Sequence, residues 1–144
     1  PAREIRLARA MLPLTRNLPP TWLLSALRKE ILRGYVDPDI GGHSLDRYLK
    51  PFATADGRTA LIEHLAALDP AETVALAPRL KDLVMPTAVA AGAHDPFLPP
   101  ALAERLRDDI PGATLDVVPD ARHFLPETSP EAVAGVIARL LPRE

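Results

Sequence analysis

The spacing of apolar residues divides the chain into a helical part and a part in which strands and helices alternate. In residues 1–82, apolar side chains recur at helical intervals, as Leu23, Leu27 and Ile31 do, and Pro or Gly interrupts them after a few turns. This part contains no convincing strand. The pattern predicts helices over residues 2–12, 21–33, 44–49 and 57–68, and a further helix that begins near residue 70.

Polar residues and prolines mark the ends of these predicted helices. Thr21 and Ser44 are expected to cap the helices that follow them, because a hydroxyl at that position can accept a bond from a free backbone N–H. Asp69 is followed directly by Pro70 and, two residues later, by Glu72, which is typical of a helix start. Residues 37–42 (DPDIGG) are rich in turn formers and predict a loop.

From residue 83 onward the pattern predicts alternating strands and helices. Residues 87–92 (TAVAAG) form a short apolar run that is typical of a buried parallel strand, and residues 113–118 (ATLDVV) predict a second strand. Each precedes a predicted helix, and this order implies a right-handed parallel crossover. Two parallel strands alone make a poor sheet, so the sequence indicates part of a larger domain. The two helices are expected over residues 99–109 and 129–141.

Composition and charge exclude several classes of function. The 17 Lys and Arg residues against 19 Asp and Glu give a net charge of −2, so no basic surface for nucleic acid is expected. The absence of cysteine excludes a thiolate nucleophile and a Cys-ligated metal site. Every apolar stretch is interrupted before the roughly 18 residues that a membrane span needs. The first residues lack the pattern of a signal peptide, and a cytoplasmic protein is expected.

Asp95 and His123 are the residues whose placement suggests chemistry. Each follows a predicted strand, and functional groups in open parallel sheets collect just beyond the carboxyl ends of the strands. A carboxylate and an imidazole placed in this way can form the orienting half of a nucleophile–His–acid triad, joined by a hydrogen bond of about 2.7–3.2 Å. The alternative is that Asp95 caps the turn before Pro96 and that His123 is an ordinary loop histidine.

Short motifs after residue 83 carry a resemblance to a known family. They are residues 92–99 (GAHDPFLP), 110–113 (IPGA) and 123–127 (HFLPE). These motifs resemble the C-terminal end of α/β-hydrolase family proteins, most closely the subgroup of haloalkane dehalogenases, epoxide hydrolases and related esterases. The resemblance implies an incomplete α/β fold: a helical lid over residues 1–82, followed by the last two β-α units of the parallel sheet over residues 83–144.

The resemblance also implies roles for individual residues. Asp95 would be the triad acid and His123 the triad base, in the family's chain order of nucleophile, acid and histidine. Aromatic side chains from the lid and from the acid and base loops line the substrate pocket in lidded members of the family. Trp22, Phe97 and Phe124 are therefore the candidate substrate-binding residues, with ordinary core packing as the alternative.

Two departures from the family pattern stand out. Family members usually place Gly directly before the histidine, where this chain has Arg122, a bulky residue that restricts the backbone. The family's nucleophile motif, a Gly-x-Ser-x-Gly turn or its Asp equivalent, is missing. The nearest match is Gly42-His43-Ser44, but Asp46 replaces the closing Gly and no strand precedes it. The nucleophile is therefore expected in an N-terminal half.

The function implied by the resemblance is hydrolysis of a small, fairly apolar substrate through a covalent intermediate. A serine nucleophile would mean esterase-like chemistry, and an aspartate would mean dehalogenase or epoxide hydrolase chemistry; the chain leaves this open. Without the nucleophile, the isolated chain is expected to be inactive. The alternatives are a non-catalytic interaction or binding fragment that keeps the back half of the fold, and a helical domain whose resemblance is accidental.

Expectations about cofactors and partners follow from the same residues. The four histidines show no metal-ligand spacing and Gly92 stands alone without a phosphate-binding loop, so neither metal nor cofactor is expected. The resemblance implies that the predicted strand at 87–92 pairs with a strand that precedes the lid, which this chain lacks, and such an unpaired edge attracts another chain. The partner is expected to be the N-terminal half of the same hydrolase or a second copy that covers this edge.

Overall fold

The computed structural model describes residues 20–141, which fall into two compact units. A helical unit contains the described residues up to Ile31 together with Gly42–Ala75. A sheet-bearing unit contains Leu32–Gly41 and the chain from Leu76 onward. The structure thus assigns a short segment between two helices to the same unit as the two strands.

The division into a lid over residues 1–82 and a core over residues 83–144 stays a prediction. The helix expected over residues 2–12 lies outside the described residues. No helix within residues 20–141 has the length and apolar character to cross a lipid bilayer.

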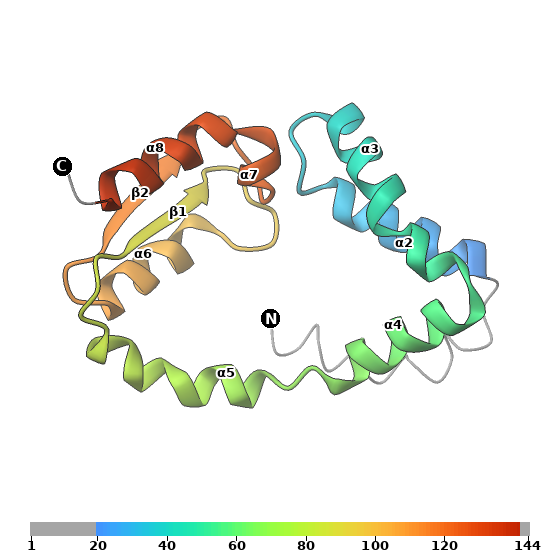
Figure 1. Cartoon of the computed structure of the whole chain (residues 1–144), viewed down its shortest axis with the longest axis horizontal. Helices are drawn as coiled ribbons and strands as arrows, with labels where there is room; N and C mark the ends of the chain where they lie inside the picture. Colours follow the sequence, from blue (N-terminus) through green and yellow to red (C-terminus); the bar gives the residue numbers. More distant parts are fainter. Residues whose placement is uncertain (1–19, 142–144) are drawn as a thin grey trace. The chain divides into compact units, whose positions relative to one another are not determined.

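Residues 20–76 consist of helices joined by short connections (Figure 1). Thr54 caps α4 by accepting a bond of 3.1 Å from the Gly57 N–H, and the Asp69 carboxylate accepts one of 2.9 Å from the Ala71 N–H. The helix start at Asp69 is therefore confirmed. The elements are α2 (Pro20–Leu32), α3 (Pro38–Tyr48), the 3-10 helix η1 (Lys50–Ala53), α4 (Ala55–Ala67) and α5 (Pro70–Leu76).

Three local predictions in this region are wrong. The expected loop over residues 37–42 is the start of α3, because the Asp37 carboxylate accepts a bond of 2.8 Å from the Asp39 N–H and Pro38 is preset for the first helical turn. Ser44 consequently lies inside α3 and not at the start of a helix. Thr21 lies inside α2, which already includes Pro20. The turn-forming residues at 37–42 therefore begin a capped helix and do not form a loop.

The sheet-bearing unit is α/β in character. Its two strands are parallel and in register from the pair Ala88–Thr114 to the pair Gly92–Val118. Helices α6 and α8 cover the sheet from opposite sides (Figure 1). Both predicted strands are confirmed to within one residue. The elements are η2 (Ala77–Asp82), β1 (Ala88–Gly92), α6 (Pro100–Asp109), β2 (Thr114–Val118), α7 (Leu125–Thr128) and α8 (Pro130–Leu140).

The sheet-bearing unit buries few apolar side chains and leaves several large ones exposed. Within the described residues β1 has only β2 beside it, so the backbone of its other edge faces no strand. Leu102 and Leu106 of α6 and Ile137 of α8 remain exposed although they are large and apolar. The buried apolar side chains of the unit are Tyr35, Ile110, Ala121, Leu125 and Val136.

Candidate active site

The candidate site lies where the loops after β1 and β2 meet. The Ala93 N–H donates to the Val118 carbonyl and the His94 N–H donates to the Ala121 carbonyl, each over 3.0 Å. Gly92 allows this approach, because a Cβ at that position would lie 2.2 Å from the Arg122 carbonyl oxygen. The last residue of β1 therefore holds the two loops at backbone contact, which brings Asp95 close to His123.

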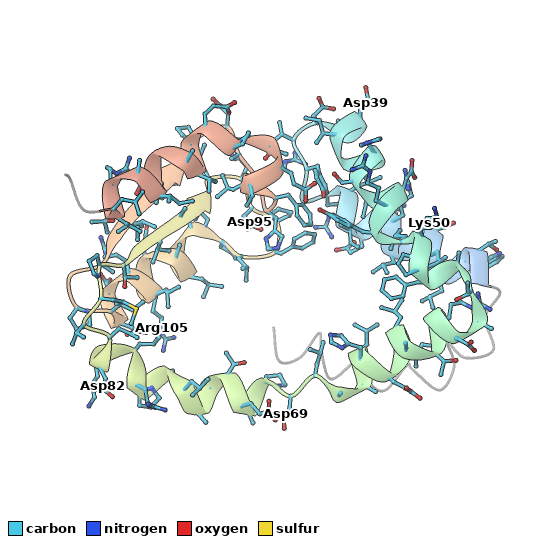
Figure 2. The ribbon with its side chains drawn as sticks, in the orientation of Figure 1. Asp39, Lys50, Asp69, Asp82, Asp95 and Arg105 are labelled. Carbon is cyan, nitrogen blue, oxygen red and sulfur yellow. The ribbon has the colours of Figure 1, made fainter. Side chains whose placement is uncertain are left out.

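The side chain of Asp95 is held by a turn that it stabilises with its own hydrogen bonds. Its Oδ1 accepts hydrogen bonds from the backbone N–H groups of Phe97 (2.8 Å) and Leu98 (2.9 Å), and its side chain is only 8% exposed. The turn expected under the alternative for Asp95 is therefore present. It uses one carboxylate oxygen, and the second oxygen stays available for another partner. Figure 2 shows Asp95 on the loop that follows β1.

The second oxygen of Asp95 binds His123. The distance between Asp95 Oδ2 and His123 Nδ1 is 2.8 Å, within the expected range. Burial opposes the charge of Asp95 and raises its pKa, but the hydrogen bonds from Leu98, His123 and Phe97 and the nearby imidazole outweigh this, so the pKa is lowered from 3.8. An ionised carboxylate can only accept, so Nδ1 of neutral His123 carries the hydrogen and Nε2 is the acceptor.

His123 sits between two aromatic rings. The Phe97 centroid lies 5.1 Å from that of the imidazole and the Phe124 centroid lies 5.0 Å away, both with interplanar angles of 88°. The imidazole is 32% exposed, and Nε2 has no hydrogen-bond partner among residues 20–141. The arrangement fixes the ring at one nitrogen and on two sides, and leaves the other nitrogen for chemistry.

Residues 33–35 support the His123 loop from a distant part of the sequence. The Gly34 carbonyl accepts hydrogen bonds from the N–H groups of His123 (3.0 Å) and Phe124 (3.4 Å). Tyr35 stacks on Phe124 with ring centroids 4.2 Å apart. Sequence reasoning missed this segment, because nothing local to Gly34 or Tyr35 indicates a contact some 90 positions away.

An apolar cavity of about 250 Å³ adjoins the pair. Residues 89–92 of β1 line one part of it, and aliphatic side chains of α6 line another. Asp95 and His123 lie among its lining residues. The remaining lining residues are Val89, Ala90, Ala91, Gly92, Leu98, Leu102, Ala103, Leu106 and Leu125.

The other candidates have different surroundings. Phe97 and Phe124 contact His123, as described, whereas Trp22 belongs to the helical unit, where its side chain is 70% exposed. Within the described residues, no three His, Cys, Asp or Glu side chains form a group that could hold a metal ion. Ser44 lies within a helix rather than on a strand-to-helix turn, so it lacks the backbone geometry of a nucleophile elbow.

Comparison with solved structures finds a similar chain titled "Est816 as an N-Acyl homoserine lactone degrading enzyme". The two chains superpose with a TM-score of 0.63 and 25% sequence identity, over 83% of this chain and 48% of that one. This chain therefore spans about half the length of that structure. No protein-family model matches the chain, and no curated protein matches it significantly.

The lowered pKa of Asp95 predicts a pH-dependent contribution to stability. A carboxyl whose pKa is lower in the folded state stabilises the fold above its unfolded value, near 3.8, and this contribution is lost as the pH falls through the folded value. Asp95→Asn retains the turn but not the charge. We expect it to lower the free energy of unfolding by about 1–3 kcal/mol at pH 6. Denaturant titrations of both proteins between pH 6 and 2.5 measure this difference, which should shrink towards the acid end.

Asp120→Asn is the matched control, because Asp120 is exposed in the turn after β2. It should leave the free energy of unfolding within about 0.5 kcal/mol at every pH. A difference for Asp95→Asn that stays constant down to pH 2.5 would contradict a lowered pKa.

Proposed function

We propose that this chain supplies the acid and the base of a hydrolase that cleaves ester or lactone bonds by a nucleophile–His–acid triad. The observation that carries the proposal is the 2.8 Å contact between Asp95 Oδ2 and His123 Nδ1 at the carboxyl ends of neighbouring parallel strands. The structural likeness to a lactone-degrading enzyme supports the same class of reaction. The complete protein would have an α/β-hydrolase fold, of which this chain is the C-terminal portion.

Each group of the pair has a defined task in this reaction. Asp95 holds the tautomer of His123 and stabilises the imidazolium that forms when Nε2 takes a proton. With a serine nucleophile, Nε2 accepts the hydroxyl proton as the oxygen attacks the carbonyl carbon, and then returns it to the departing alkoxide. Nε2 next takes a proton from water as the water oxygen attacks the acyl carbon; the bond from that carbon to the serine oxygen then breaks, the acid is released, and the proton returns to the serine. With an aspartate nucleophile, which would mean a haloalkane or an epoxide as the substrate, His123 acts only in the step that activates water.

The nucleophile of the proposed enzyme comes from polypeptide outside these 144 residues. Ser25 and Ser44 lie inside helices, and Ser129 directly precedes one, so none stands on a turn between a strand and a helix. The 48% coverage of the similar structure leaves room for a further segment of comparable length. On its own, the chain would therefore have no measurable turnover.

The substrate we propose is a small, fairly apolar ester or lactone. Aromatic rings flank the imidazole, so a charged substrate beside Nε2 would lose hydration without compensation. N-acyl homoserine lactones, the substrates named for the similar structure, combine an apolar acyl chain with a hydrolysable ring. They are the first compounds to test.

Substitutions in the complete hydrolase test the pair. His123→Gln is expected to lower kcat for lactone or ester hydrolysis by at least about 10³-fold, and Asp95→Asn by about 10²–10⁴-fold. His94→Gln is the matched control, because His94 is exposed and contributes to the contact between the loops through its backbone N–H and not through its side chain. It should retain kcat within about twofold. Steady-state kinetics with purified variants measure these effects.

Equal turnover by the His123→Gln variant and the unsubstituted protein would refute the proposal. The absence of any hydrolysis by the complete protein across lactones, esters, haloalkanes and epoxides would support the other candidate, a non-catalytic binding fragment.

The free edge of β1 points to the partner of this chain. Residues of β1 and the apolar side chains of α6 line the cavity beside this edge. A strand added there would pair with β1 and cover the apolar side chains of α6. We propose that this strand comes from the N-terminal half of the same hydrolase. A second copy of the chain is the alternative occupant.

Light scattering on the purified chain, alone and with the nucleophile-bearing half, tests the partner. We expect a stable one-to-one complex with that half. Leu106→Asp places a charge in the groove beside β1 and should weaken the complex at least about tenfold, because the carboxylate would be buried unpaired. Val74→Asp, at an exposed position of the helical unit, is the control and should bind normally. A cooperatively folded 15.6 kDa monomer that ignores the other half would contradict the proposal.

A further inference from the structure

We propose that Arg122 is a positioning residue that holds His123 in its working place by binding the backbone of residues 33–35. The inference rests on the proposed function of His123. It gives a role to the arginine that stands directly before the histidine, where the family pattern usually has glycine.

Consecutive backbone carbonyls face consecutive residues of the histidine loop. Arg122 Nη1 donates to the Arg33 carbonyl over 3.1 Å and to the Tyr35 carbonyl over 3.3 Å. The Gly34 carbonyl between them accepts from the His123 and Phe124 N–H groups. Three successive carbonyls are thus bound by three successive residues, which fixes the register of one segment on the other.

Residues 33–35 form a firm support for this contact. Tyr35 is 1% exposed, stacks on Phe124, and donates a hydrogen bond of 3.0 Å from its hydroxyl to Glu127 Oε2. Gly34 packs directly against the rings beside His123, since a Cβ there would lie 2.7 Å from a ring carbon of Phe124 and 2.9 Å from one of Phe97. The φ angle of Gly34 is negative, so position 34 requires glycine for space.

Arg122 completes the restraint on the imidazole. Asp95 fixes only Nδ1, and the ring could still shift with its backbone while keeping that bond. The bonds from Gly34 to the His123 and Phe124 N–H groups restrain that backbone, and Arg122 locks the segment that provides them. Arg122 is an exposed residue, so its removal opens no core cavity. Its loss should therefore disturb the histidine more than the fold.

The test compares Arg122→Ala, Arg122→Lys and a matched control in the complete hydrolase. Arg139→Ala is the control, because Arg139 is another exposed arginine of this unit, paired with Asp116. We expect Arg122→Ala to lower kcat about 10- to 100-fold with KM changed less than about twofold. Arg122→Lys should recover only part of this, since a flexible ammonium does not reproduce the planar fork. Arg139→Ala should keep kcat within about twofold.

A spectroscopic readout separates positioning from general damage. The Nδ1 proton of His123, observed by NMR with labelled histidine, should broaden or shift upfield in Arg122→Ala, while the melting temperature falls no more than in Arg139→Ala. Full kcat and an unchanged Nδ1 proton in Arg122→Ala would overturn the inference. A loss of kcat matched by an equal loss in the control, or by global unfolding, would overturn it as well.

Failure of the underlying function gives a different result. If His123→Gln keeps full activity, the triad itself is wrong. If His123→Gln is inactive while Arg122→Ala behaves as unsubstituted protein, only the positioning role is wrong.

Discussion

The backbone contact between the loops after β1 and β2 is the constraint on which the candidate site depends. Gly92 makes it possible, because any side chain there would overlap the Arg122 carbonyl oxygen. The two backbone hydrogen bonds across it, from the Ala93 and His94 N–H groups, set the distance between the loops without any side chain. The strand register and Gly92 therefore bring Asp95 and His123 together. The hydrogen bond between their side chains only completes the arrangement.

The chemistry of the pair follows from how Asp95 is shared. One oxygen is committed to backbone N–H groups, which keep the carboxyl ionised despite its low exposure, and the other holds the imidazole. Phe97 and Phe124 limit the freedom of the ring without hydrogen bonds of their own. In the proposed reaction this imidazole takes a proton at Nε2 and serves a nucleophile from outside the chain.

The sequence predicted the parts of this site that depend on local pattern. The strands at 87–92 and 113–118 were recognisable because their apolar, β-branched runs end in turn formers, and their ends located Asp95 and His123. Residues 37–42 were misjudged because Asp-Pro followed by glycines can begin a helix as well as a turn, and capping by Asp37 decided between them.

Residues 33–35 and their contact with Arg122 could not be predicted, because the partners lie 87 and 89 positions apart and are joined through backbone carbonyls, which any residue provides. The same limit applies to Trp22. Its side chain type suggested a pocket, but the sequence carries no signal of what an exposed aromatic residue on a helix faces.

The central claim is that Asp95 and His123 serve a nucleophile that lies outside this chain. Rapid quenching of the complete hydrolase with a slowly cleaved lactone or ester, followed by peptide mass spectrometry, tests it most directly. The account predicts a covalent adduct on a serine outside residues 1–144, and a longer lifetime of that adduct in the Asp95→Asn variant, because water activation by His123 is impaired. Hydrolysis without any adduct, or an adduct on Ser25, Ser44 or Ser129, would contradict it.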